Sequence, residues 1–225
     1  MKRSAWMFLW LLLPVPLVAQ AGPLVLPGDD VGEEHYGSPP AIDVGQQWLG
    51  LYARGDSSWV QSVSVVLEVR PPDEPGEPGT HEYVVEPRRP VLLMIGVGQA
   101  RVGPARTAIG YTDALSSGEP SRELQLGSAQ YQLVLDTTDP NACDDVVTLS
   151  DGQTTQRLYD AAADTTYTCD EARFDVHWAG DRDGDGRLDL LATFSSKYSY
   201  LPRRLYLSSA AAPGDIVAIV SSFER

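Results

Sequence analysis

Chain breakers are the feature that most limits what this chain can fold into. Its 225 residues include 20 glycines and 17 prolines, and no window keeps the 3.6-residue hydrophobic period of an amphipathic helix. Short apolar segments stand between the breakers instead, with turn signals about every 8–12 residues. This pattern predicts an all-β protein built from short antiparallel strands, either one β-sandwich or two packed β units.

Several segments carry this prediction. Residues 62–70 alternate valine and leucine with polar side chains, which predicts one half-buried strand. Gly127-Ser128 and Asp151-Gly152 each separate two apolar segments and are typical of tight hairpin turns. Residues 161–164 and 208–212 are alanine- and serine-rich and can each form a turn of helix.

The amino-terminal segment has the pattern of an export signal. Lys2 and Arg3 precede an apolar run from Ala5 to Val18, and a small-x-small cleavage pattern closes residues 1–21. The alternative is a membrane anchor, but the run is shorter than the roughly 20 residues that span a bilayer. We therefore expect a signal peptide, a secreted or periplasmic protein, and no membrane span after cleavage.

The remainder divides into three parts. Residues 22–44 mix glycine, proline and acidic residues and are expected to be an extended leader, with structure beginning near Gln46. A polar stretch at residues 113–121 then separates an amino-terminal β unit, residues 45–115, from a carboxy-terminal β unit, residues 116–225.

Charge excludes some classes of partner. The formal net charge is −14, which argues against nucleic acid and against anionic lipid headgroups, because both need a basic face. The 17 basic residues are almost all arginines, a bias that suits the GC-rich genome of a bacterium.

The two cysteines fit an oxidising compartment. Cys143 and Cys169 form an even pair in a chain with an export signal, which favours a disulfide over two buried free thiols. Such a bridge would close a loop of about 27 residues, worth about 3–4 kcal/mol in the chain-entropy description.

One constellation carries chemistry, in the loop of residues 181–189. Carboxylates occupy positions 1, 3, 5 and 9, and Gly186 at position 6 permits a sharp turn. Ca²⁺ prefers six to eight oxygen ligands at flexible geometry, which this spacing can supply together with water. Arg182 is expected to face solvent. The candidate ligands are Asp181, Asp183, Asp185, Asp189 and the carbonyl oxygen of Arg187. The alternative is an acidic hairpin turn without a metal.

The flanks of this loop are strand-like. Phe174, Val176 and Trp178 alternate with polar residues ahead of it, and residues 188–194 follow, whereas an EF-hand would need flanking helices and a glutamate where Ala192 stands. Residues 174–194 resemble the FG-GAP/VCBS-type repeat of integrin-like β-propellers, which has a strand, a D-x-D-x-D-G-x-x-D loop and a second strand. The resemblance implies a calcium-binding β-hairpin; a single copy does not imply a propeller.

These features predict an exported, non-catalytic, calcium-stabilised β module that binds an unknown protein or glycan at the cell envelope or outside. An exposed aromatic patch around Trp48, Trp59 or Tyr200 would favour such binding. The alternatives are a purely structural envelope protein, or a secreted hydrolase that uses the acidic cluster or Ser57. Gly55-Asp56-Ser57 resembles the start of a GDS-type esterase block, but no Asp-x-x-His follows it.

Overall fold

A computed structural model describes most of the chain beyond its first 24 residues. The described residues are 25–27, 34–36, 45, 47–54, 57–71, 82–87, 92–96, 102–108, 114–116, 118–137, 144–163, 169–197 and 200–223. They form antiparallel strands and two single 3-10 turns, and the predicted all-β fold is confirmed. The two turns, η1 (Ala161–Ala163) and η2 (Ser208–Ala210), lie where the sequence predicted single helical turns.

The strands form three sheets. In spatial order, the nine-stranded sheet contains β1 (Val25–Pro27), β7 (Leu93–Gly96), β3 (Trp48–Arg54), β4 (Ser57–Val63), β8 (Gly103–Thr107), β13 (Arg173–Asp181), β14 (Asp189–Ser195), β15 (Arg203–Leu207) and β16 (Ala218–Phe223). The four-stranded sheet contains β12 (Thr155–Asp160), β11 (Val146–Ser150), β10 (Ala129–Asp136) and β9 (Ser121–Leu126). The three-stranded sheet contains β2 (Glu34–Tyr36), β6 (Glu82–Pro87) and β5 (Val65–Arg70).

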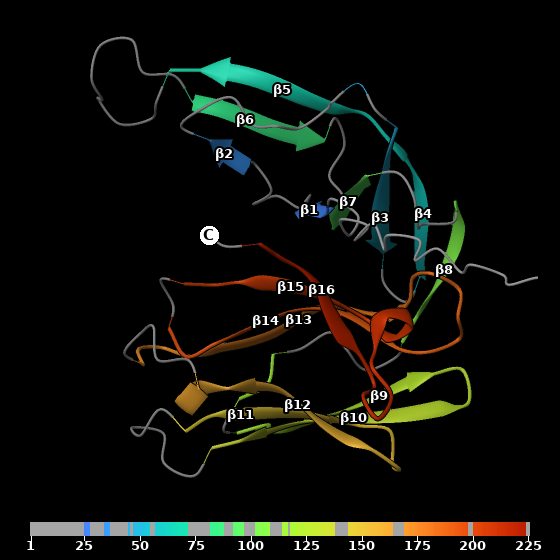
Figure 1. Ribbon diagram of the computed structural model, residues 1–225, viewed down its shortest axis with the longest axis vertical. Coiled ribbons are helices and arrows are strands. Elements are labelled where there is room, and N and C mark those ends of the chain that lie inside the picture. Colours follow the sequence, from blue (N-terminus) through green and yellow to red (C-terminus); the bar gives the residue numbers. More distant parts are fainter. Residues whose placement is uncertain are drawn as a thin grey trace, which may run out of the picture.

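The middle layer of the molecule is the part of the large sheet that includes β13, β14 and β15. The four-stranded sheet lies against one of its faces (Figure 1), and the main apolar core between them includes Leu133, Leu149, Leu190 and Phe194. Burial on this scale supplies the main stabilisation of a sandwich. The arrangement is β-sandwich-like, as predicted.

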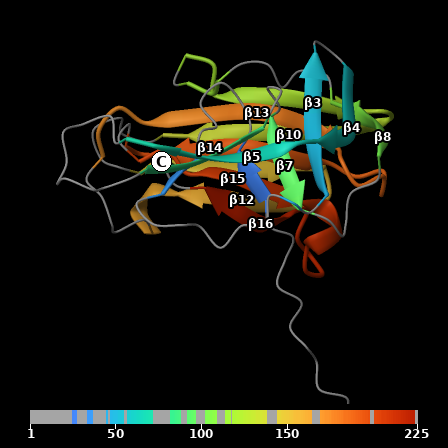
Figure 2. The same ribbon diagram turned by 90° about the horizontal axis from the view of Figure 1, so that it is seen from above.

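The other face of the middle layer carries a second apolar cluster. It joins strands from both halves of the chain: Leu49, Leu51, Val60, Trp178, Leu191, Leu205 and Leu207. The large sheet curls to bring these residues together, and β3 and β4 run across the direction of β13 and β14 (Figure 2). Strand β8 makes the link, because it pairs with β4 and with the end of β13. The predicted division between residues 115 and 116 stays a prediction.

An irregularity in β13 sends its aromatic residues to different cores. The pairing with β14 shifts register between Val176 and Trp178, so His177 is an extra residue on this strand. Phe174 therefore packs in the main core, whereas Trp178 packs in the second cluster. Uninterrupted alternation along residues 174–178 would place both rings on one face, and the bulge at His177 is the reason that they lie on opposite faces.

Two other expectations are corrected. The segment 62–70 is not one strand: it divides at Ser64, and its two parts belong to different sheets. Regular structure also begins before Gln46, because β1 and β2 lie within residues 25–36. Each of these has three residues and pairs with a longer strand, so its own sequence carries too little periodicity to be recognised.

The predicted hairpin turns are confirmed. Gly127 has a φ of 62° between β9 and β10, and Gly152 has a φ of 85° between β11 and β12. The Asp151 carboxylate accepts hydrogen bonds from the backbone N–H groups of Gln153 and Thr154, at 2.9 and 2.7 Å. Side-chain acceptance of this kind is the reason that Asp-Gly pairs favour turns.

Candidate metal centre

The acidic loop joins two central strands of the large sheet. Asp181 is the last residue of β13 and Asp189 is the first residue of β14. Between them the backbone turns back at Gly184 and Gly186, whose φ angles are 82° and 84°. Residues with a side chain rarely adopt such angles, so the glycine predicted to permit the sharp turn does so, and Gly184 assists it.

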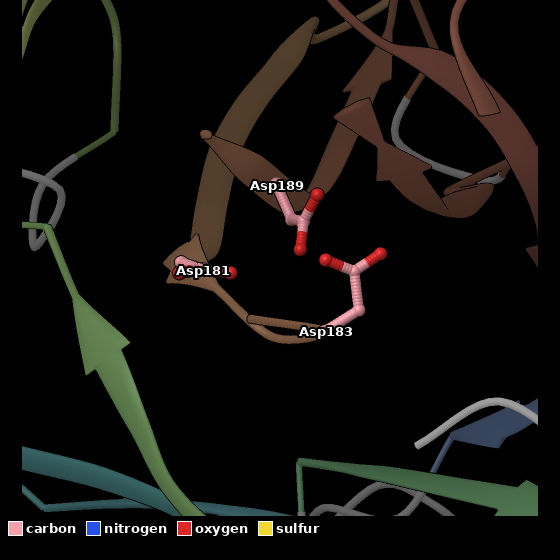
Figure 3. A group of neighbouring side chains, drawn as sticks. All are labelled: Asp181, Asp183 and Asp189. Carbon is pink, nitrogen blue, oxygen red and sulfur yellow. The ribbon is translucent and has the colours of Figure 1, made fainter. Parts of the chain in front are cut away.

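Three of the carboxylates converge. Asp181, Asp183 and Asp189 point toward one another (Figure 3), and each offers an oxygen within 4.8 Å of the others. Oxygens on opposite sides of an ion with bonds of about 2.3–2.6 Å lie about 4.6–5.2 Å apart. The spacing of this group therefore suits a bound cation, and these three residues could hold a metal ion.

Two of these carboxylates are held by hydrogen bonds, one from the loop itself and one from η2. Asp181 accepts hydrogen bonds from the backbone N–H groups of Gly184 and Gly186, at 2.7 and 3.1 Å. Asp183 accepts a hydrogen bond from the hydroxyl of Ser209, at 2.5 Å. Each carboxylate is thus oriented before any ligand binds, which reduces the cost of assembling a site.

Asp189 is completely buried and is held by Ser208, a residue that the sequence did not indicate. One of its oxygens accepts from the backbone N–H and the hydroxyl of Ser208, at 2.9 and 3.0 Å. The other accepts from the backbone N–H of Arg182, at 2.9 Å. Ser208 starts η2, 19 residues further along the chain, so no local motif connects it with the loop.

Asp185 lies outside the three-aspartate group. It accepts hydrogen bonds from the backbone of Arg187 at 2.8 Å and from the Ser208 hydroxyl at 3.0 Å, and it pairs with the Arg187 guanidinium at 3.0 Å. Burial raises the pKa of Asp185, but these hydrogen bonds outweigh burial and hold that pKa below its usual value. Ligation by Asp185 and by the Arg187 carbonyl oxygen stays a prediction.

Arg182 does not face solvent, which corrects the expectation from the sequence. Its side chain is 3% exposed, and its guanidinium nitrogens hydrogen-bond none of the residues that the structure describes. Burial lowers the pKa of Arg182, and the charges of Asp189 and Asp183 act in the opposite direction. The correction has a physical reason: β8 pairs with the end of β13, so Arg182 follows a junction inside the sheet and not a free edge.

A cleft of about 410 Å³ opens beside the loop. Its walls are the loop residues 181–186 on one side and Val102, Gly103, Pro104 and Arg106 on the other. The cleft therefore gives the acidic loop a surface that ligands can reach from outside.

Burial also perturbs the acidity of the site. Burial, together with the charge of Asp183, raises the pKa of Asp189 to about 6, in spite of the hydrogen bonds from Ser208 and Arg182. A bound cation favours the ionised carboxylate, so protons and cations compete for this group.

This competition predicts opposite pH trends with and without metal. In chelator, the folded state keeps the Asp189 proton up to about pH 6, whereas the unfolded chain loses it near pH 4. The contribution of Asp189 to the free energy of unfolding should therefore fall as the pH rises from about 4 to about 6. In excess Ca²⁺, affinity and stability should instead rise over that window. Thermal melting of wild type against Asp189→Asn, under both conditions, isolates this group from other carboxylates. Parallel trends in the two conditions would contradict the assignment.

The structure also places several residues that the sequence suggested for other functions. Ser57 begins β4, and the His177 ring hydrogen-bonds the Thr193 hydroxyl at 2.8 Å. Trp48 is buried, and Trp59 stacks on Tyr52 with ring centroids 5.7 Å apart. These two tryptophans therefore form no shared exposed patch.

Two predictions concern residues that the structure does not describe. The signal peptide, residues 1–21, is outside the described ranges. Cys143 is as well, so its disulfide with Cys169 stays a prediction; the described part of the chain holds no free cysteine. Within the same described ranges, no helix has the length and apolarity to cross a membrane.

Comparison of this chain with known proteins identifies no relative. No family model matches this chain, and neither the curated proteins nor the solved structures contain a significant match. The resemblance of residues 174–194 to an FG-GAP/VCBS-type repeat stays a prediction from the sequence.

Proposed function

We propose that this chain is an exported, non-catalytic β module that Ca²⁺ stabilises. The observation that carries the proposal is the convergence of Asp181, Asp183 and Asp189 at the turn between two central strands. An ion there would tie β13, β14 and the η2 segment together, since Ser208 and Ser209 already bond to the carboxylates.

The donor set favours a hard divalent cation. All three side chains of the group are carboxylates, whereas structural zinc sites use cysteine and histidine. Ca²⁺ accepts irregular oxygen geometry more readily than Mg²⁺, which requires near-ideal octahedral coordination. Water molecules and the carbonyl oxygen of Arg187 would complete the coordination shell of the ion. An oxygen-only donor set of this kind therefore favours Ca²⁺ as the ion.

A structural role suits the way in which the carboxylates are engaged. Asp181 and Asp189, at the ends of β13 and β14, already accept hydrogen bonds from backbone N–H groups of the loop and of η2. A bound ion would therefore fix the turn that connects these strands. The cleft beside the loop supplies an accessible surface for the protein or glycan partner that we propose, and the amino-terminal signal pattern supports a secreted or periplasmic location.

Calcium should raise the stability of the mature protein. For a Kd of about 0.1 mM, typical of extracellular modules at the tight end, about 1 mM free Ca²⁺ contributes about 1.4 kcal/mol. Thermal melting with Ca²⁺ and with chelator measures this difference, and calorimetry measures the binding. We expect a clearly higher melting temperature with Ca²⁺ and a much smaller rise with Mg²⁺.

Asp183→Ala provides the control, because Asp183 is only half-buried and makes few bonds that the fold needs. This variant should lose most of the calcium-dependent difference and should melt in chelator at or slightly above the wild-type temperature. If wild type melts identically in Ca²⁺ and chelator, and millimolar Ca²⁺ gives no heat of binding, the loop is an acidic turn and the proposal fails.

A further inference from the structure

The charges around the acidic loop divide into two groups. Asp185 and Arg187 form an ion pair at 3.0 Å and balance each other. The remaining group consists of the three convergent carboxylates and Arg182, which is buried and lines the same cleft as Asp181 and Asp183. Arg106 also lines the cleft, but it is exposed, so solvent screens its charge.

The second group has a net negative charge. Three ionised carboxylates and one guanidinium have a net charge of −2, because arginine stays protonated in proteins. A divalent cation brings the group to neutrality, whereas a trivalent cation leaves an excess positive charge. Asp181, Asp189 and Arg182 are buried, and unbalanced charge in such a place is costly.

Arg182 has no local bonding role that would explain its position. Its side chain is 3% exposed, and none of its guanidinium nitrogens bonds a residue in the described part of the chain. Only its backbone N–H bonds to the cluster, through Asp189. Burying a guanidinium without hydrogen-bond partners is unfavourable. Because the Arg182 guanidinium makes no such bonds with the described residues, it acts on the site through its positive charge.

We propose that Arg182 determines which cation charge the site accepts, so that it selects divalent over trivalent ions. The inference rests on the proposed metal function of this loop and adds the residue that sets its specificity. Each unit of cation charge meets the repulsion of the Arg182 guanidinium. A trivalent ion therefore loses more affinity to this residue than a divalent ion of similar size.

The test compares Ca²⁺ with Tb³⁺, a trivalent ion of similar coordination chemistry. Calorimetry measures the Ca²⁺ affinity, and Tb³⁺ luminescence in competition with Ca²⁺ measures the ratio of the two affinities. We expect Arg182→Met to bind both ions more tightly than wild type, and to raise the ratio of Tb³⁺ to Ca²⁺ affinity by about tenfold, a change that corresponds to about 1.4 kcal/mol.

Two further variants make the result decisive. Arg106→Met removes an exposed cation from the same cleft and should change the ratio by less than about twofold. Arg182→Gln is also neutral, keeps polar donors, and should reproduce the Arg182→Met result. If the variants at position 182 fold and bind both ions with the wild-type ratio, the selectivity inference is wrong while the metal site stands.

The remaining outcomes are equally clear. If wild type binds neither ion, the proposed function fails first, and the selectivity inference fails with it. In chelator, Arg182→Met should melt no lower than wild type, because it removes a buried charge without hydrogen-bond partners. If both variants at position 182 fail to fold, Arg182 is a residue that the fold requires, and the proposal that its charge serves selectivity is overturned.

Discussion

Asp189→Ala should reduce the free energy of unfolding by about 3–5 kcal/mol even without metal. The Asp189 carboxylate accepts three hydrogen bonds in a completely buried position, two of them from Ser208 and one from Arg182. Alanine leaves two backbone N–H groups there without an acceptor, and a buried unpaired donor loses its full solvation energy. Denaturant unfolding in the presence of chelator measures the loss.

Asp183→Ala is the matched control for this prediction. Both variants remove one carboxylate from the proposed metal site, but Asp183 is half-buried and bonds to the exposed Ser209 hydroxyl. In chelator, Asp189→Ala should therefore be several kcal/mol less stable than Asp183→Ala, while both lose calcium binding. Equal stabilities would mean that Asp189 serves the metal alone and does not hold η2 to the sheet.

Gly180→Ala should be destabilising by about 3 kcal/mol. An added Cβ at this position would lie 2.0 Å from the Arg106 carbonyl oxygen and 2.5 Å from the Trp178 ring. The oxygen belongs to the backbone of β8, which pairs with Gly180 and Asp181. The clash can therefore be relieved only by separating β8 from β13, where the two halves of the large sheet join.

Gly118→Ala is the control for the glycine prediction. Its added Cβ would meet nothing closer than 3.9 Å, so we expect a change within about 0.5 kcal/mol, as at ordinary surface positions. Urea unfolding of both variants provides the comparison. A Gly180→Ala protein as stable as wild type would show that the β8–β13 junction does not need the close approach of the two backbones.

Local chemistry made several features predictable. The turn at Asp151-Gly152 depends on bonds between residues at most three apart, and the sequence contains everything needed to form it. The convergence of Asp181 and Asp183 follows likewise from their spacing and from the glycines of their own loop. Such features depend only on residues of one short segment, so they can be predicted without knowing the rest of the fold.

Features that depend on distant segments were not predictable. Arg182 lies in a polar loop, and its burial follows from the position of β8 beside the end of β13. Ser208 contacts the site only because β15 pairs with β14 and brings η2 to the loop.

Strand β14 shows a further limit of periodicity. The sequence indicates one apolar face, but every residue of β14 is buried. Its second face is covered by a cluster that includes Leu51 and Val60, which belong to strands more than 100 residues earlier in the chain. An alternating pattern describes one strand, and it carries no information about which distant strands cover that strand.

The second apolar cluster also determines when each part of the chain can acquire its final structure. Leu51 and Val60 share this cluster with Trp178, Leu191 and Leu205, which come more than 100 residues later in the chain. When a chain leaves a ribosome or a translocation pore with its amino terminus first, these early strands stay exposed until residues 178–205 have emerged. The four strands between residues 121 and 160 pair only with their sequence neighbours, so their hydrogen bonds can form during this interval. The apolar face of their sheet still stays uncovered until β13, β14 and β15 pack against it. The amino-terminal strands must wait, and during this wait the growing chain is most exposed to aggregation and to proteases.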